Sequence, residues 1–225
     1  SLALAIFTLP FQLKFLIYQV EWGRALENPY LSIFFSQTNF FLLVSAILFL
    51  VHKKRSNEAI NFGSQNYLLV VLSLFFCIAL SLFVSPSQDY IFKFLLLGKI
   101  FELFIFYILI VNKVLKFLDL IKVFVLAMTI QSLIAILQFA FQSDLGLQIL
   151  WETDISTQNP LIARFYVLGV PFVRAYGTFP HPNILAGFLL LSFFFTFLIP
   201  QNFKNERYML LALQFFALLT TFSRT

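Results

Sequence analysis

Apolar residues occur along this chain in long runs, with short polar segments between them. Runs of about 20 such residues are typical of helices that cross a membrane. The runs of this kind lie at about 2–18, 31–51, 67–85, 90–111, 117–140, 183–199 and 207–222. We therefore expect an all-α fold, a polytopic transmembrane helical bundle of about seven spans that forms a single membrane domain over residues 1–225.

The longest segment between the predicted helices is 141–182. Its part at 161–173 is strongly apolar but contains Gly169 and Pro171. This part is too short for a span, so we expect it to lie along the membrane surface or to fold back over the helices. The chain begins with Ser1 and stops at Thr225, directly after a predicted span, and we expect it to be a fragment of a longer protein.

The composition agrees with a membrane protein. Hydrophobic residues make up 60% of the chain and charged residues 11%, whereas a typical soluble domain is about 25% charged. So many aromatic residues exclude a disordered chain, and one cysteine excludes a disulfide scaffold and a cysteine-based metal cluster. The net charge of +5 is spread thinly between apolar runs, so we expect no nucleic-acid partner.

The loop charges predict an orientation, because cytoplasmic loops are enriched in Lys and Arg. Three alternate loops carry most of the basic residues: Lys53, Lys54, Arg55, Lys113, Lys116, Lys122, Lys204 and Arg207. Only Glu58, Asp119 and Glu206 oppose them. We therefore expect a cytoplasmic N-terminus and cytoplasmic loops at 52–66, 112–122 and 200–207, with 141–182 outside.

Two groups of polar residues lie inside predicted spans. Lys99 and Glu102 are three residues apart and share a helix face. They form either part of a polar substrate path or an ion pair that orients the helix, and we favour the ion pair. Gln131 and Gln138, seven residues apart, form a polar stripe with Ser132. Such side chains commonly form hydrogen bonds between membrane helices.

The segment Arg174-Ala-Tyr-Gly-Thr-Phe-Pro-His-Pro-Asn183 precedes the sixth predicted helix. Asn183 is placed to cap a helix that begins at Ile184, and the N-terminus of that helix faces outward. Helix N-termini bind phosphates, and Arg174 can add a bidentate contact. The alternative is a capped helix with Arg174 against lipid headgroups.

Two further residues are candidates for the same site. Arg224, at the outer end of the seventh predicted span, is either a snorkelling anchor or a second phosphate ligand. His181 is a weak candidate for a general base, and a structural role is the more common one for such a residue. No set of residues suggests a metal site.

These motifs resemble the O-antigen ligase and O-antigen polymerase family of bacterial envelope glycosyltransferases. The resemblance rests on QSLIAILQF at 131–139, Gly146, RAYGTFPHPNILAGFL at 174–189 and TTFSR at 220–224. It extends over about residues 2–224 and is strongest from 131 onward. The chain stops before the long outer loop that carries further functional residues in this family.

The resemblance implies a multi-pass protein of the bacterial cytoplasmic membrane. It implies transfer of a glycan from a polyprenyl-diphosphate donor to a glycan, lipid or protein hydroxyl on the outer face, without a metal or a nucleotide sugar. Arg residues hold the donor diphosphate in this family, which points to Arg174 and Arg224, and we expect Asn183 at the start of the sixth helix to bind the same diphosphate. Two other classes remain open on the sequence, a transporter or flippase of lipid-linked sugars and a non-catalytic membrane subunit of an envelope assembly.

The predicted orientation is tested by labelling introduced cysteines from outside the cell. In a Cys77→Ser background, we expect a membrane-impermeant thiol reagent to label a cysteine at Thr157 and not one at Asn57, because 141–182 is external and 52–66 is cytoplasmic. Labelling at position 57 in intact cells would reverse the orientation.

Overall fold

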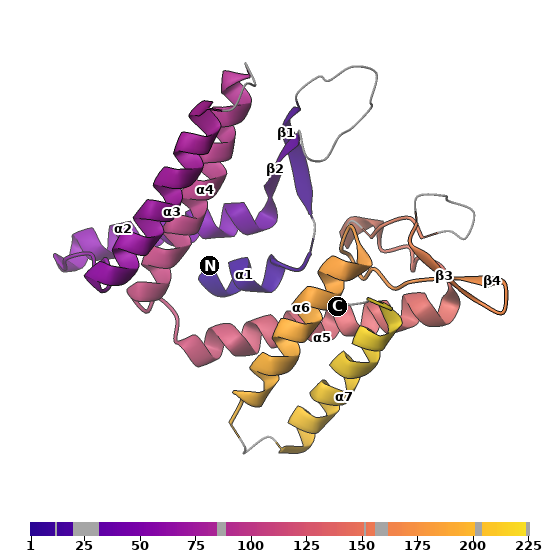
Figure 1. Cartoon of the computed structure of the whole chain (residues 1–225). Coiled ribbons are helices and arrows are strands. Elements are labelled where there is room, and N and C mark those ends of the chain that lie inside the picture. Colours follow the sequence, from indigo (N-terminus) through magenta and orange to yellow (C-terminus); the bar gives the residue numbers. More distant parts are fainter. Residues whose placement is uncertain are drawn as a thin grey trace. The chain divides into compact units, whose positions relative to one another are not determined.

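The computed structural model describes residues 1–11, 13–19, 32–84, 89–150, 152–155, 162–200 and 204–223. These residues are mostly helical (Figure 1). The α-helices are α1 (Leu2–Thr8), α2 (Gln37–Ser56), α3 (Gln65–Val84), α4 (Tyr90–Val111), α5 (Phe117–Phe141), α6 (Pro182–Phe197) and α7 (Lys204–Thr220). The strands are β1 (Lys14–Gln19), β2 (Ser32–Ser36), β3 (Arg164–Val167) and β4 (Val170–Val173), with a short 3-10 helix, η2, at Gln148–Leu150.

The chain divides into two compact units. Unit 1 comprises Ser1–Ala5 and Lys14–Lys116, and unit 2 comprises Ile6–Leu13 and Phe117–Thr225. Three helices of the described residues, α3, α4 and α5, are long and apolar enough to cross a membrane, and α6 is a shorter apolar helix. The five helices predicted from residue 67 onward are all present within a few residues, but three helices of membrane-spanning length among the described residues do not confirm seven spans.

The first predicted span, at 2–18, is wrong. Helix α1 ends at Thr8, two residues before Pro10, and β1 begins at Lys14. Proline has no backbone N–H and its ring clashes with the preceding helical turn, so Pro10 prevents the helix from continuing. The apolar residues after it pair as a strand instead.

The second predicted span is displaced along the chain. Its first residues form β2, which pairs with β1 in an antiparallel hairpin, and α2 begins only at Gln37. Ser36 and Asn39 form a capping box, in which the Ser36 hydroxyl accepts from the Asn39 backbone N–H and the Asn39 side chain accepts from that of Ser36. This local signal fixes the start of the helix.

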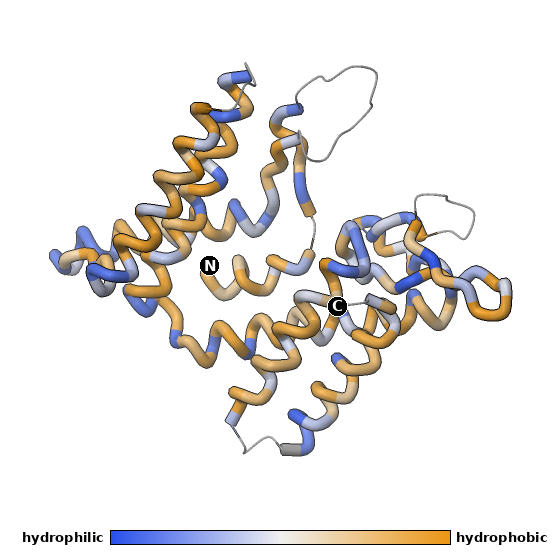
Figure 2. Tube along the Cα trace, in the orientation of Figure 1, coloured by the Kyte–Doolittle hydropathy of each residue, from blue (hydrophilic) through white to orange (hydrophobic). Residues whose placement is uncertain are grey.

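Helices α2 and α3 both pack on α4 in unit 1. None of the residues of α3 is buried, although the helix is mostly apolar after its first two residues (Figure 2). An apolar helix with this exposure is typical of contact with lipid.

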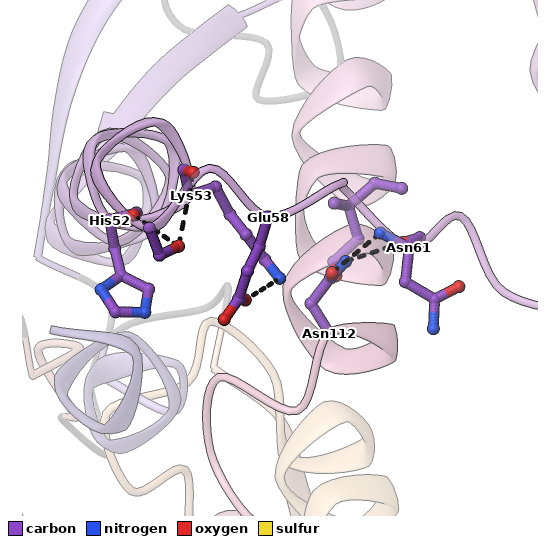
Figure 3. A network of polar contacts seen from close by, with 7 residues as sticks. His52, Lys53, Glu58, Asn61 and Asn112 are labelled. Atoms are coloured by element: carbon purple, nitrogen blue, oxygen red, sulfur yellow. Dashed lines mark hydrogen bonds and ion pairs between the residues drawn. The ribbon is translucent and has the colours of Figure 1, made fainter.

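Polar contacts join the loop after α2 to the end of α4 (Figure 3). Lys53 and Glu58 form an ion pair at 2.8 Å between Nζ and Oε2, and the hydrogen bond from Lys53 lowers the pKa of the Glu58 carboxyl. The Asn112 side chain accepts from the Asn61 N–H and donates to its carbonyl. This loop is therefore tied to the C-terminal end of α4.

Unit 2 is built on α5, against which both α6 and α7 pack. Helices α6 and α7 also contact each other through a buried polar cluster. Gln214 of α7 donates to the Ser192 hydroxyl and accepts from Thr196. Because each buried group has a partner, the cluster fixes how α7 lies on α6.

The apolar part of 141–182 forms a hairpin and not an eighth span. Strands β3 and β4 pair in antiparallel register, and the turn between them has positive φ at Leu168 and Gly169. Phe165 of β3 stacks on Phe139 of α5 and on Phe222 beyond α7. These rings attach the hairpin to the helices of unit 2.

Candidate functional site

The segment from Arg174 to His181 connects β4 to α6 in unit 2. Ala175, Tyr176, Gly177, Thr178 and Phe179 are all buried, yet they belong to neither a helix nor a strand. Their backbone N–H groups therefore need partners from elsewhere, because an unpaired buried amide is costly. We call residues 175–179 the buried loop.

Gln138 of α5 supplies the partner of two of these N–H groups. Its Oε1 accepts from the N–H groups of Tyr176 and Gly177, at 3.1 and 2.7 Å. Its Nε2 donates to the Gly177 carbonyl at 2.8 Å and to Glu152 Oε1 at 2.7 Å. One buried side chain thus replaces the backbone pairing that a strand would have provided.

Gln131 makes the matching contact two helical turns earlier. Its Oε1 accepts from the Thr178 N–H at 3.0 Å, and its Nε2 donates to the Thr178 hydroxyl at 2.7 Å and to the Pro10 carbonyl at 3.3 Å. The Thr178 hydroxyl donates to the same Pro10 carbonyl at 3.1 Å. The buried loop is therefore held between α5 and the turn that follows α1.

These contacts correct the interpretation of the polar stripe. Gln131 and Gln138 share a helix face, as expected, but they bind the backbone of the buried loop and not another helix. Ser132 bonds the Met128 carbonyl within α5. Seven residues along a helix is about 10 Å, and the buried loop runs along this face.

Gly177 is required by the close approach of the loop to α5. Its φ is +60°, and a Cβ atom there would lie 2.6 Å from Gln131 Oε1. A larger residue would be strained and would displace the glutamine. In the sequence, this glycine stands out only as part of the motif at 174–189.

Glu152 also supports the loop, although the sequence analysis did not single it out. Its Oε1 accepts from the Leu145 N–H and from Gln138, and its Oε2 accepts from the Leu147 N–H at 2.6 Å. This carboxylate fixes the Gln138 amide so that its oxygen points at the loop. Only the folded chain brings these residues together, so no local pattern indicates the role.

Arg174 lies at the start of the segment and joins α7 to α6. Its Nε donates to the Thr221 carbonyl and its Nη2 to Asn183 Oδ1, both at 2.6 Å. The Ala175 N–H donates to the Thr220 carbonyl at 3.1 Å. The structure thus brings together Arg174 and Asn183, two of the three residues predicted to bind a diphosphate. Arg224 lies outside the described residues.

The start of α6 differs from the prediction. The helix begins at Pro182, and its cap is His181 and not Asn183. Proline is favoured at the first helical position, and the Asn183 side chain accepts from Arg174 instead. His181 Nδ1 accepts from the Asn183 N–H at 3.1 Å, so the neutral ring carries its proton on Nε2. This geometry is that of a helix cap, which is a structural role.

Lys99 and Glu102 form an ion pair in α4 of unit 1, with 3.6 Å between Nζ and Oε1. Asn39 of α2, which the sequence analysis overlooked, bridges them. Its Oδ1 accepts from Lys99 at 2.8 Å, and its Nδ2 donates to Glu102 Oε2. Because both charges contact α2, the arrangement favours a role in orienting α2 on α4 over a substrate path.

No protein-family model, curated protein or solved structure matches this chain.

The Lys99–Glu102 pair leads to a prediction about stability. We expect Lys99→Met or Glu102→Gln alone to lower the free energy of unfolding by about 3 kcal/mol, and the double variant to lose less, because a single change leaves an uncompensated charge on an apolar helix long enough to cross a membrane. Thermal unfolding in detergent measures this, with Glu58→Gln in the exposed Lys53 pair as the control of little effect.

A double variant that loses as much as the two single variants together would contradict this role. A double variant that folds normally but loses the activity of the protein would place the pair in a substrate path.

Proposed function

We propose that this chain belongs to a multi-pass glycosyltransferase of the bacterial cytoplasmic membrane, of the O-antigen ligase or polymerase type. It transfers a glycan from a polyprenyl-diphosphate donor to a hydroxyl of a glycan, a lipid or a protein on the outer face. The observation that carries the proposal is the pairing of Arg174 with Asn183 at the N-terminus of α6. The residues that form this site are those on which the family resemblance rests.

The proposed orientation keeps the basic loops in the cytoplasm. Helices α2 to α7 cross the membrane, so the segment that contains Arg174 and the start of α6 lies on the outer side. Because residues 2–18 do not form a span, the N-terminus changes sides and lies with the outer surface. The bond from Thr178 to the Pro10 carbonyl supports this placement.

The site suits the charge of a diphosphate. The N-terminus of α6 carries the positive end of the helix dipole, and the Arg174 guanidinium beside it is planar and permanently charged. When the acceptor hydroxyl attacks the anomeric carbon, the bond to the diphosphate oxygen breaks, the diphosphate leaves with the electron pair, and the hydroxyl proton is released. Positive groups at the leaving oxygen stabilise this transition state.

An apolar groove beside this site suits a prenyl chain. It has a volume of about 350 Å³ and is lined by Ile136, Phe139, Phe216, Leu219, Thr220 and Phe222. One side of the groove is formed by the segment Thr220–Phe222. In this segment the Thr221 carbonyl accepts from Arg174, and the Thr220 carbonyl accepts from the Ala175 N–H. A diphosphate at Arg174 would therefore have an apolar surface next to it for its lipid tail.

The proposed role of the two arginines leads to a prediction about binding of the lipid-linked donor. In the protein as the cell makes it, we expect Arg174→Lys and Arg224→Lys each to raise the KM for the lipid-linked donor roughly tenfold to hundredfold, because a charge-assisted contact is worth about 1.5–3 kcal/mol. Arg164→Lys, on β3 outside the motif, is the matched control and should leave transfer unchanged. Transfer to the acceptor is measured in membranes, with the thermal stability of each variant.

Normal transfer by the Arg174→Lys, Arg224→Lys double variant would overturn the diphosphate site. A loss of stability in Arg174→Lys that accounts for its whole loss of transfer would reduce Arg174 to a structural link between α6 and α7.

A further inference from the structure

A second pocket lies in unit 2, at the ends of the helices remote from the buried loop. It is formed by the first half of α5, by Ile199 after α6 and by the first turns of α7, and its volume is about 290 Å³. The buried loop contacts α5 at Gln131 and Gln138 instead. This second pocket is therefore separate from the proposed donor site.

Arg207 of α7 provides the polar feature of the pocket. Its Nε is buried and has no hydrogen-bond partner among the described residues. Its guanidinium lies 5.7 Å from the centre of the Tyr208 ring, which holds the planar group in place. A buried N–H without an acceptor is costly, so this group is suited to an acceptor that comes from a ligand.

Lys122 of α5 adds a second positive charge to the pocket. Its ammonium lies 4.0 Å from Asp119 in a half-exposed ion pair, and such pairs are weak. Glu206 also lines the pocket, but it is exposed to solvent. Two basic side chains thus line the pocket, and the carboxylate that lines it belongs to an exposed residue, so we expect the pocket to favour an anion.

Apart from Thr129, whose hydroxyl donates to the Val125 carbonyl, the rest of the wall is apolar. Leu126 and Leu210 line the pocket together with Val125, and Leu126 is 56% exposed. This apolar surface continues out of the pocket along α5. A ligand that fits both features has an anionic head and an apolar tail.

We propose that this pocket binds the phosphate headgroup of an anionic phospholipid, with Arg207 and Lys122 on the phosphate and an acyl chain along Leu126 and Leu210. Basic pockets between membrane helices on the cytoplasmic side bind anionic headgroups in this way, and an arginine fork suits a phosphate. The inference rests on the proposed orientation but not on glycan transfer. Binding here would anchor α7 to α5 in the inner leaflet.

Native mass spectrometry of the full chain in detergent tests this lipid site. Phosphatidylglycerol and phosphatidylcholine with identical acyl chains are the probes, and inorganic phosphate is the competitor. We expect phosphatidylglycerol to bind more tightly than phosphatidylcholine, and Arg207→Gln or Lys122→Gln to weaken its binding about tenfold. Lys54→Gln, which removes the same charge from an exposed site in unit 1, is the matched control and should change binding little.

Equal binding of the two lipids would overturn the proposal, and so would equal losses of lipid affinity in Arg207→Gln and Lys54→Gln. Full displacement of the lipid by inorganic phosphate at the same concentration would also overturn it, because the pocket would then bind a soluble phosphate compound. Because Lys122 is half exposed, its variant keeps the fold and reports on binding alone. The Arg174→Lys variant should keep its lipid preference, so failure of the donor site and failure of this pocket are distinguishable.

Discussion

Five buried residues outside any regular element need hydrogen-bond partners, and two glutamines of α5 provide them for three of the five backbone N–H groups. Gln138 bonds the backbone of Tyr176 and Gly177, and Gln131 bonds that of Thr178. Without these bonds, the buried loop would leave several amides unpaired, at a cost of about 1–3 kcal/mol for each group. The position of everything that follows the loop in the chain depends on this contact.

The contact connects α5 to the proposed site. The buried loop begins directly after Arg174 and ends directly before the Pro180–His181 turn that starts α6. Fixing the loop on α5 therefore places the Arg174 guanidinium beside Asn183 and the end of α7. The proposed site for a lipid-linked anion is thus positioned by a helix and not by the loop alone, as precise binding requires.

The sequence predicts helices well where long apolar runs have clear ends, and α4 was placed at its observed bounds, 90–111. The predicted span at residues 2–18 was wrong, because Pro10 prevents the helix from continuing although the run is hydrophobic. The sequence singled out Arg174 and Asn183 as candidate site residues, and Gln131 and Gln138 as a polar stripe. It did not indicate that the glutamines bind the buried loop. Glu152, Asn39 and the close approach at Gly177 could not be predicted, because each acts through residues brought near only by folding.

Residue-resolved hydrogen exchange in lipid nanodiscs tests most directly whether the two glutamines hold the buried loop. We expect slow exchange at Tyr176, Gly177 and Thr178, and we expect Gln138→Met to speed exchange of the first two amides about tenfold or more while Leu189 in α6 stays protected. Gln131→Met should act on Thr178 instead. Unchanged exchange in both variants, or an equal rise throughout unit 2, would contradict the account.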